Sequence, residues 1–96
     1  EVEAGKQGKH ILEHNNYLPG RSYLTVPEDE IQKLVRQYAG TGRIQRDKKD
    51  RWAHKEIITS DTIIGVSVDP VSGAEQETNK FVIHYAKKGV HIVPCE

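Results

Sequence analysis

The chain lacks features that would place it in several large protein classes. Its one cysteine, Cys95, allows no internal disulfide, and no apolar run approaches the ~18 residues of a membrane-spanning helix, so we expect no membrane insertion by this domain. No signal-peptide pattern is visible. The sequence also contains no methionine, even at position 1, which predicts a domain cut from the end of a longer protein.

The chain also has no excess of charge of either sign. Lysine plus arginine and aspartate plus glutamate each number 14, so the overall charge gives no argument for nucleic-acid binding. The basic residues are nevertheless concentrated in one segment, residues 43–55, which holds Arg43, Arg46, Lys48, Lys49, Arg51 and Lys55 against two aspartates. Such a run is either a solvated loop or a local cationic surface.

The length and composition predict one small domain. A chain of 96 residues has room for a single core, so we assign residues 1–96 to one domain. Its apolar fraction is 35%, below the roughly 45–50% of average soluble domains. We therefore expect a thin core and long polar loops.

The clearest predicted element is an amphipathic helix over residues 27–39. Four apolar or aromatic residues recur there at the spacing of one helix face, and they are Ile31, Leu34, Val35 and Tyr38. Gly40 is expected to end the helix.

Strands are predicted after the helix, where apolar residues alternate with polar ones. The predicted strands cover residues 52–59, 62–68, 80–86 and 90–93; residues 41–50 are expected to form an exposed loop, and Tyr23 and Leu24 to pair briefly with the sheet. This order predicts an α+β fold, with N-terminal helical elements packed on a twisted antiparallel sheet of about four to five strands.

The last predicted hairpin allows an argument about which way its histidines point. If the apolar residues of both strands face the core, Tyr85 lies opposite Ile92 and the loop consists of Lys88 and Gly89. His84 and His91 then share the other, polar face of the sheet. This face is either the floor of an active site or an ordinary solvated sheet surface.

Histidine and lysine side chains gather near both ends of the chain, and together they suit metal-free cleavage of RNA. An imidazole titrates near neutral pH, so it can take the proton from a 2′-hydroxyl or give one to the leaving oxygen. Lysine ammonium groups stabilise the charge of the phosphorane. We predict His10 and His84 as the proton-transfer pair, with Lys6, Lys9 and Gln7 at the phosphate.

Other side chains are candidates for binding the substrate. Arg21 and Ser22 suit a phosphate, because a guanidinium fork matches phosphate oxygens, although an ordinary loop is the competing interpretation. His91 and Lys87, in the final hairpin, are further candidates for binding the substrate. Tyr85, with Trp52, suits stacking on bases if these rings do not belong to the core.

No convincing metal site is visible. His10 and His14 are four residues apart, a spacing that can bind zinc on a helix, but Glu13 is not at the metalloprotease position and no third ligand is near in sequence. We therefore expect no metal and no cofactor.

The chain resembles the bacterial polymorphic toxin type 50 family over nearly its whole length. The resemblance rests on the N-terminal runs Gly5-Lys6-Gln7-Gly8-Lys9-His10-Ile11 and His14-Asn15-Asn16-Tyr17-Leu18-Pro19-Gly20-Arg21-Ser22, on the central runs Tyr38-Ala39-Gly40-Thr41-Gly42, Ile63-Ile64-Gly65 and Val68-Asp69-Pro70, and on the segment from His84 to Pro94. One departure is Ala86, where many relatives have serine.

This resemblance implies a toxin nuclease carried as the C-terminal module of a longer secreted or surface-delivered protein. Its fold would be the barnase/EndoU/colicin/RelE-like one, and its activity a metal-independent endoribonuclease acting on RNA, with tRNA the expected substrate, in the cytoplasm of a competing bacterium. The implied partners are the RNA, a cognate immunity protein and, for some contact-dependent toxins, a host translation factor.

Two other functions remain open on the sequence alone. One is a non-catalytic module of a phage structural protein that binds nucleic acid or protein, because related modules occur in phage head proteins. The other is a metal-dependent nuclease, which would lose its activity in excess chelator.

Overall fold

The computed structural model describes residues 2, 7–11, 20–49, 51–87 and 89–96. Its elements are a 3₁₀ turn η1 (Gly8–His10), β1 (Tyr23–Leu24), the helix α2 (Glu28–Tyr38), β2 (Arg43–Arg46), β3 (Trp52–Thr59), β4 (Gly65–Val68), β5 (Glu75–Thr78), β6 (Lys80–Ala86) and β7 (Gly89–Cys95).

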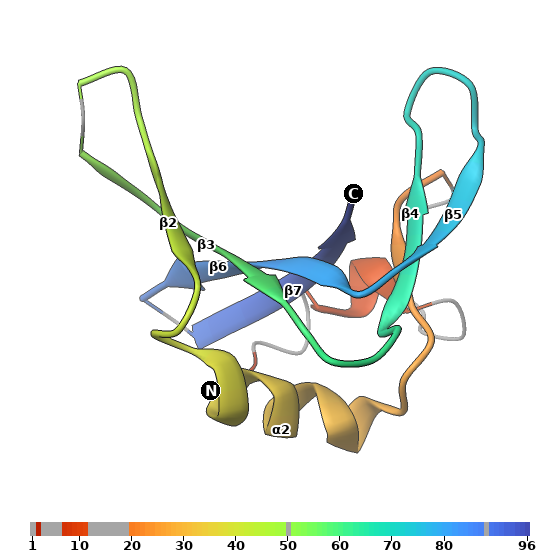
Figure 1. Ribbon diagram of the computed structural model, residues 1–96, viewed down its shortest axis with the longest axis horizontal. Coiled ribbons are helices and arrows are strands. Elements are labelled where there is room, and N and C mark those ends of the chain that lie inside the picture. Colours follow the sequence, from red (N-terminus) through yellow and green to blue (C-terminus); the bar gives the residue numbers. More distant parts are fainter. Residues whose placement is uncertain (1, 3–6, 12–19, 50, 88) are drawn as a thin grey trace.

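The strands form two antiparallel sheets. The larger has the order β2-β3-β6-β7 and the smaller the order β1-β4-β5. Figure 1 shows that the β2–β3 and β4–β5 hairpins project on one side of the molecule, whereas α2 lies on the other. The larger sheet therefore has one face covered by the helix and a second face turned toward the side on which the hairpins rise.

The core lies between α2 and the larger sheet. Ile31 and Val35 of α2 pack in one cluster with residues of β3, β6 and β7, namely Ile58, Phe81, Ile83 and Ile92. Burying a side chain of this size contributes about 1.5–3 kcal/mol. The helix carries acidic residues in its first turn, which suit its positive end, and ends where Gly40 adopts a φ of 86°.

The expected α+β architecture is wrong. The protein is mostly β, with α2 as its one α-helix among the described residues and with two sheets of three and four strands in place of a single sheet under several helices. The N-terminal part expected to be helical contributes only the short turn η1 in the described range. Residues 12–19 lie outside the described residues.

Two strands were missed because they carry no apolar alternation. All four residues of β2 are exposed, and so are the first three of β5. Residues 41–50, expected to be an exposed loop, therefore contain a strand. Edge strands of this kind are held by backbone hydrogen bonds to a neighbour, and their side-chain pattern does not reveal them.

The elements with strong periodicity were predicted well. The helix expected over residues 27–39 is Glu28–Tyr38, and the strands expected over 52–59 and 80–86 have those bounds. The strand expected over 62–68 begins later, at Gly65, and the one expected over 90–93 is longer at both ends. Tyr23 and Leu24 pair with β4, as predicted.

The register of the final hairpin differs from the prediction by two residues. Tyr85 lies opposite Val90 instead of Ile92, and Ala86 pairs with Gly89. A shift of two leaves every side chain on its predicted face, because the strand period is two. The predicted common face of His84 and His91 is therefore confirmed, and the two residues lie directly opposite each other.

Candidate active site

A row of polar side chains crosses the larger sheet from edge to edge. Strand pairing aligns one residue from each of the four strands, and these are Gln45, Lys55, His84 and His91. Each alternates with a residue that points toward α2, as His84 does with the buried Ile83. The row, called the histidine row below, therefore lies on the face opposite the helix.

The imidazole rings of this row are stacked. The centroids of His84 and His91 are 4.6 Å apart and the ring planes differ by 13°. The ring of His10 is nearly parallel to that of His91, with 6.2 Å between centroids. Residues from the two ends of the chain thus bring three imidazole rings together.

His10 is held in this stack by the backbone. Only 5% of the residue is exposed, and its Nδ1 lies 2.8 Å from the carbonyl oxygen of Ser22. A carbonyl oxygen only accepts hydrogen bonds, so Nδ1 carries the proton and donates it. Any proton transfer to or from His10 would therefore use its other nitrogen, Nε2.

Gln7 fastens the turn η1 to the edge of the sheet. It is 2% exposed, its Nε2 donates to the carbonyl oxygen of Ile92 at 2.9 Å, and its Oε1 accepts the Ile92 N–H at 2.7 Å. The side chain thereby supplies β7 with the partner that a further strand would provide. Because it is buried and engaged in this way, Gln7 is placed to position His10 and not to contact a phosphate.

The surroundings of His84 favour its neutral form. Burial lowers the pKa of its imidazole below the ordinary value, and the positive charge of Lys55 and the neighbouring His10 lower it further. At pH 7 a histidine of this kind is predominantly a neutral base. The ammonium of Lys55 stands beside it as a fixed positive charge, since Lys55 is the residue paired with His84 on the adjacent strand.

Three other predicted site residues, Ser22, Arg21 and Lys87, lie outside the row. The Ser22 hydroxyl oxygen accepts the Val68 N–H at 2.9 Å and so links the loop before β1 to β4. Arg21 is exposed just before β1, and Lys87 is exposed after β6. Lys6 and His14 lie outside the described residues, and the side chain of Lys9 is not described.

Tyr85 lies on the helix-facing side of its strand, in a second polar cluster. Its hydroxyl donates to Oε1 of Glu56 at 2.5 Å, and the same carboxylate accepts the N–H groups of Gly40 at 3.0 Å and Gly42 at 2.7 Å. Burial tends to raise the pKa of the Glu56 carboxyl, but these three donors outweigh it and the pKa is lowered. Burial and the adjacent carboxylate raise the pKa of Tyr85 to about 12.

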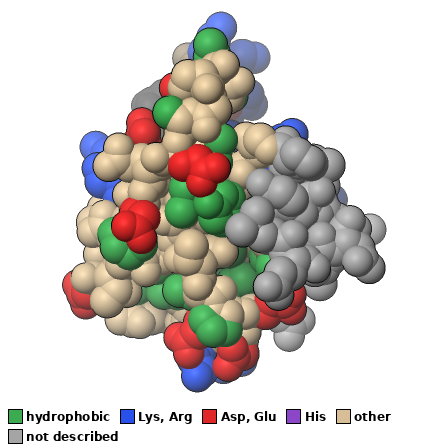
Figure 2. Space-filling view, turned by 90° about the vertical axis from the view of Figure 1, so that its right-hand side faces the viewer, with side chains coloured by type: hydrophobic (Ala, Val, Ile, Leu, Met, Phe, Trp, Pro, Cys, Tyr) green, Lys and Arg blue, Asp and Glu red, His purple; other side chains and the backbone are tan. Residues whose placement is uncertain are grey.

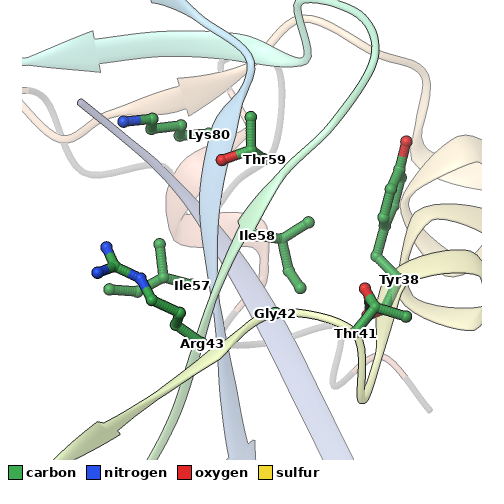
Figure 3. Close-up of a pocket in the computed structure, with 8 residues that line it drawn as sticks. All are labelled: Tyr38, Thr41, Gly42, Arg43, Ile57, Ile58, Thr59 and Lys80. Carbon is green, nitrogen blue, oxygen red and sulfur yellow. Dashed lines mark hydrogen bonds between the residues drawn. The ribbon is translucent and has the colours of Figure 1, made fainter.

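A hollow of about 380 Å³ lies at the other end of β3 and does not coincide with the histidine row. It is lined by Tyr38, Thr41, Gly42, Arg43, Ile57, Ile58, Thr59 and Lys80. Figure 3 shows these side chains on both sides of the strand, with Arg43 and Lys80 apart from Tyr38. Since no histidine or carboxylate lines it, the candidate active site rests on the histidine row.

The described residues contain neither a metal site nor a membrane-spanning helix. Among the described residues, no group of three or more histidine, cysteine, aspartate and glutamate side chains has the arrangement of a metal site. Within the same part of the chain, no helix is long and apolar enough to cross a membrane.

Lys55 and Gln45 are members of the row that the sequence analysis did not select. Lys55 appeared only as part of a basic segment. The alternation of residues 52–59 could have placed it on the polar face, but its partner depends on the pairing of β3 with β6, which no local pattern reveals.

Comparison with known protein families identifies the chain. The family described as bacterial toxin 50 matches residues 2–94. The chain belongs to this family. No curated protein sequence matches it. The family resemblance expected from the sequence is therefore confirmed, and the chain is a bacterial toxin domain.

Proposed function

We propose that this bacterial toxin 50 domain is a metal-independent endoribonuclease, with tRNA as the expected substrate, and that the histidine row is its active site. One observation carries the proposal: His84 stacks on His91 while the ammonium-bearing Lys55 occupies the adjoining position of the row. A neutral imidazole, neighbouring imidazoles and a fixed cation on one sheet face are the groups that 2′-oxygen attack requires.

The reaction proceeds by transfer of two protons. Neutral His84 takes the proton of the 2′-hydroxyl, the 2′-oxygen bonds to phosphorus, and the bond from phosphorus to the 5′-oxygen breaks. A protonated imidazole gives its proton to that leaving oxygen, and the products are a 2′,3′-cyclic phosphate and a 5′-hydroxyl. We assign the acid to His10, whose ring, like that of His84, lies against His91.

The cations act on the charge that develops at phosphorus. Lys55 adjoins His84, so its ammonium is placed to stabilise the phosphorane oxygens. Lys6 and Lys9 remain part of the proposal as further phosphate ligands. Arg21, Ser22 and Lys87 are proposed to bind more distant parts of the RNA.

The family supports the proposed setting of this activity. A toxin domain has to reach a target cell and its producer has to be protected, so we propose delivery by a larger protein, action in the cytoplasm of the target bacterium and neutralisation by a cognate immunity protein. A host translation factor is included as a partner that some toxins require.

The test is cleavage of total bacterial RNA in excess chelator, with and without cell extract. Wild type, His84→Ala and His10→Ala are compared, and Val71→Ala is the control because Val71 is 95% exposed on the opposite hairpin. We expect discrete fragments from wild type and the control only, with ends that carry the cyclic phosphate. Unchanged cleavage by both histidine variants would overturn the proposed pair, and a lack of cleavage in every lane would favour a non-catalytic binding module.

A further inference from the structure

An aromatic pocket lies where β3 begins, next to the loop of the β2–β3 hairpin. It has a volume of about 480 Å³ and is lined by Trp52, His54, Tyr85, Ala86 and Lys87. Building on the proposed ribonuclease function, we propose that this pocket holds one unpaired base of the RNA that the domain cleaves.

The rings of the pocket are arranged to accept a further flat group. The ring of Trp52 contacts His54, with 4.8 Å between centroids, and Tyr85, with 5.3 Å, at tilts of 37° and 56°. Trp52 nevertheless remains 40% exposed. An indole that is supported on two sides and still open to solvent is a stacking platform, and bases of every type stack on such rings.

The orientation of the platform is fixed before any ligand arrives. The indole Nε1 of Trp52 donates to the carbonyl oxygen of Lys55 at 3.1 Å. Tyr85 is fixed from the other side by its hydrogen bond to the buried Glu56. Binding a base therefore costs little side-chain ordering, which favours affinity.

The backbone of β3 departs from regular geometry at the pocket. Gln45 pairs with Lys55 but the next residue of β2, Arg46, pairs with Trp52, so Ala53 and His54 form a bulge. His54 has a φ of 62°, in the left-handed region that side-chain-bearing residues seldom adopt. Bulges and residues of this kind concentrate where a protein aims side chains at a ligand.

Charge indicates that the ligand is an anionic polymer. Residues 43–55 contain six basic residues against Asp47 and Asp50. The β4–β5 hairpin, residues 65–78, contains Asp69, Glu75 and Glu77 and no basic residue. Figure 2, which shows the side of the molecule that carries this second hairpin, has acidic side chains across the face and basic ones at its margins. A phosphate backbone is thus attracted along β2–β3 and repelled from β4–β5.

The position of the pocket relative to the row determines which base it holds. His54 directly precedes Lys55, and Tyr85 directly follows His84, so the pocket begins one residue beyond the row along both strands. Because neighbouring strand residues point to opposite faces, Tyr85 places the pocket on the helix-facing side of the sheet, whereas the row lies on the other side. An RNA that occupies both has to pass around the ends of β3 and β6, so the pocket takes a base beyond the nucleotides that lie at the row.

The experiment uses the natural fluorescence of Trp52, which is the only tryptophan in the chain. The probe is a short single-stranded RNA with every 2′-hydroxyl methylated, so that attack is blocked. We expect saturable quenching on binding. Trp52→Ala should weaken binding, measured by anisotropy of the labelled RNA, about 5- to 150-fold, which corresponds to the stacking free energy of one base. Trp52→Phe should restore most of the affinity, and Val71→Ala should leave it unchanged.

A second probe locates the base, and the outcomes separate the pocket from the proposed activity. RNAs with one abasic position are compared, and the abasic site that weakens wild type should have no further effect on Trp52→Ala. Binding without quenching, together with equal affinity of Trp52→Ala, would overturn the pocket even if wild type cleaves RNA. Quenching of Trp52 together with weaker RNA binding by Trp52→Ala, in a protein that cleaves no RNA, would keep the pocket and overturn the ribonuclease. A protein that binds none of the RNAs contradicts both.

Discussion

His84 and His91 face each other across the β6–β7 hairpin with their rings stacked at 4.6 Å. Two imidazolium rings at this separation repel each other, so adding a proton to one of them makes it harder to add a proton to the other. Together with the burial that lowers its pKa, this arrangement suits the neutral form of His84, which a general base needs.

The pH dependence of cleavage should report the neutral state of His84. Its pKa lies below the ordinary value, so the activity should rise with pH along an acidic limb with its midpoint below about 6.5. Lys55→Ala removes a positive charge that disfavours the imidazolium, and should move the midpoint upward. Lys55→Arg should keep it in place. An unchanged midpoint in Lys55→Ala would show that the Lys55 charge does not act on His84.

The assignment of acid and base should be separable with a modified substrate. In an RNA whose 5′-oxygen at the cleaved bond is replaced by sulfur, the leaving group departs without a proton. His10→Ala and His84→Ala should each lower cleavage of ordinary RNA about 10²–10⁴-fold. The modified RNA should rescue His10→Ala and leave His84→Ala impaired. Rescue of His91→Ala in place of His10→Ala would move the acid to His91.

The bond between Tyr85 and Glu56 should make stability depend on pH in the alkaline range. The pKa of Tyr85 is about 12 in the folded protein, above the ordinary value of 10.0. This contribution is therefore fully present below pH 10 and is lost as the pH rises toward 12. Tyr85→Phe should lower the free energy of unfolding by about 1–3 kcal/mol at neutral pH and remove this part of the alkaline slope. Equal slopes in both proteins, followed by urea unfolding, would contradict the prediction.

Removing the Gln7 amide should weaken both the fold and the site. Gln7→Ala leaves the Ile92 N–H and carbonyl without their partner, and we expect a loss of about 1–3 kcal/mol in the free energy of unfolding. Activity should fall under conditions in which the variant is still folded, because His10 follows Gln7 in the same turn. Gln76→Ala, on an exposed part of β5, is the matched control and should change neither.

Local periodicity predicted the parts of this protein that bury one face. Ile31 and Val35 on one helix stripe, and Phe81 and Ile83 on one strand face, are fixed by the core they share. The same rule placed His84 and His91 on one face. This prediction stayed correct although the predicted register was wrong by two residues, because a shift of two does not change the face.

The features that could not be predicted from the sequence depend on partners far away in the chain. Nothing local distinguishes a buried Gln7 from a solvated one, since its burial follows from meeting Ile92. The β2 and β5 strands are polar and exposed, so only their neighbours make them strands. Lys55 enters the site through its pairing with His84, for the same reason.

The hydrogen bonds between Gln7 and Ile92 join residues that are 85 positions apart in the chain. A contact of such high sequence separation closes a long loop, and the entropy of that loop is lost when the contact forms. A nascent chain that has not yet reached β7 lacks both Ile92, the hydrogen-bond partner of Gln7, and His91, the residue against whose ring His10 stacks. The complete stack of rings thus arises only after synthesis of this strand, and a ribosome making the toxin carries an unfinished site until then.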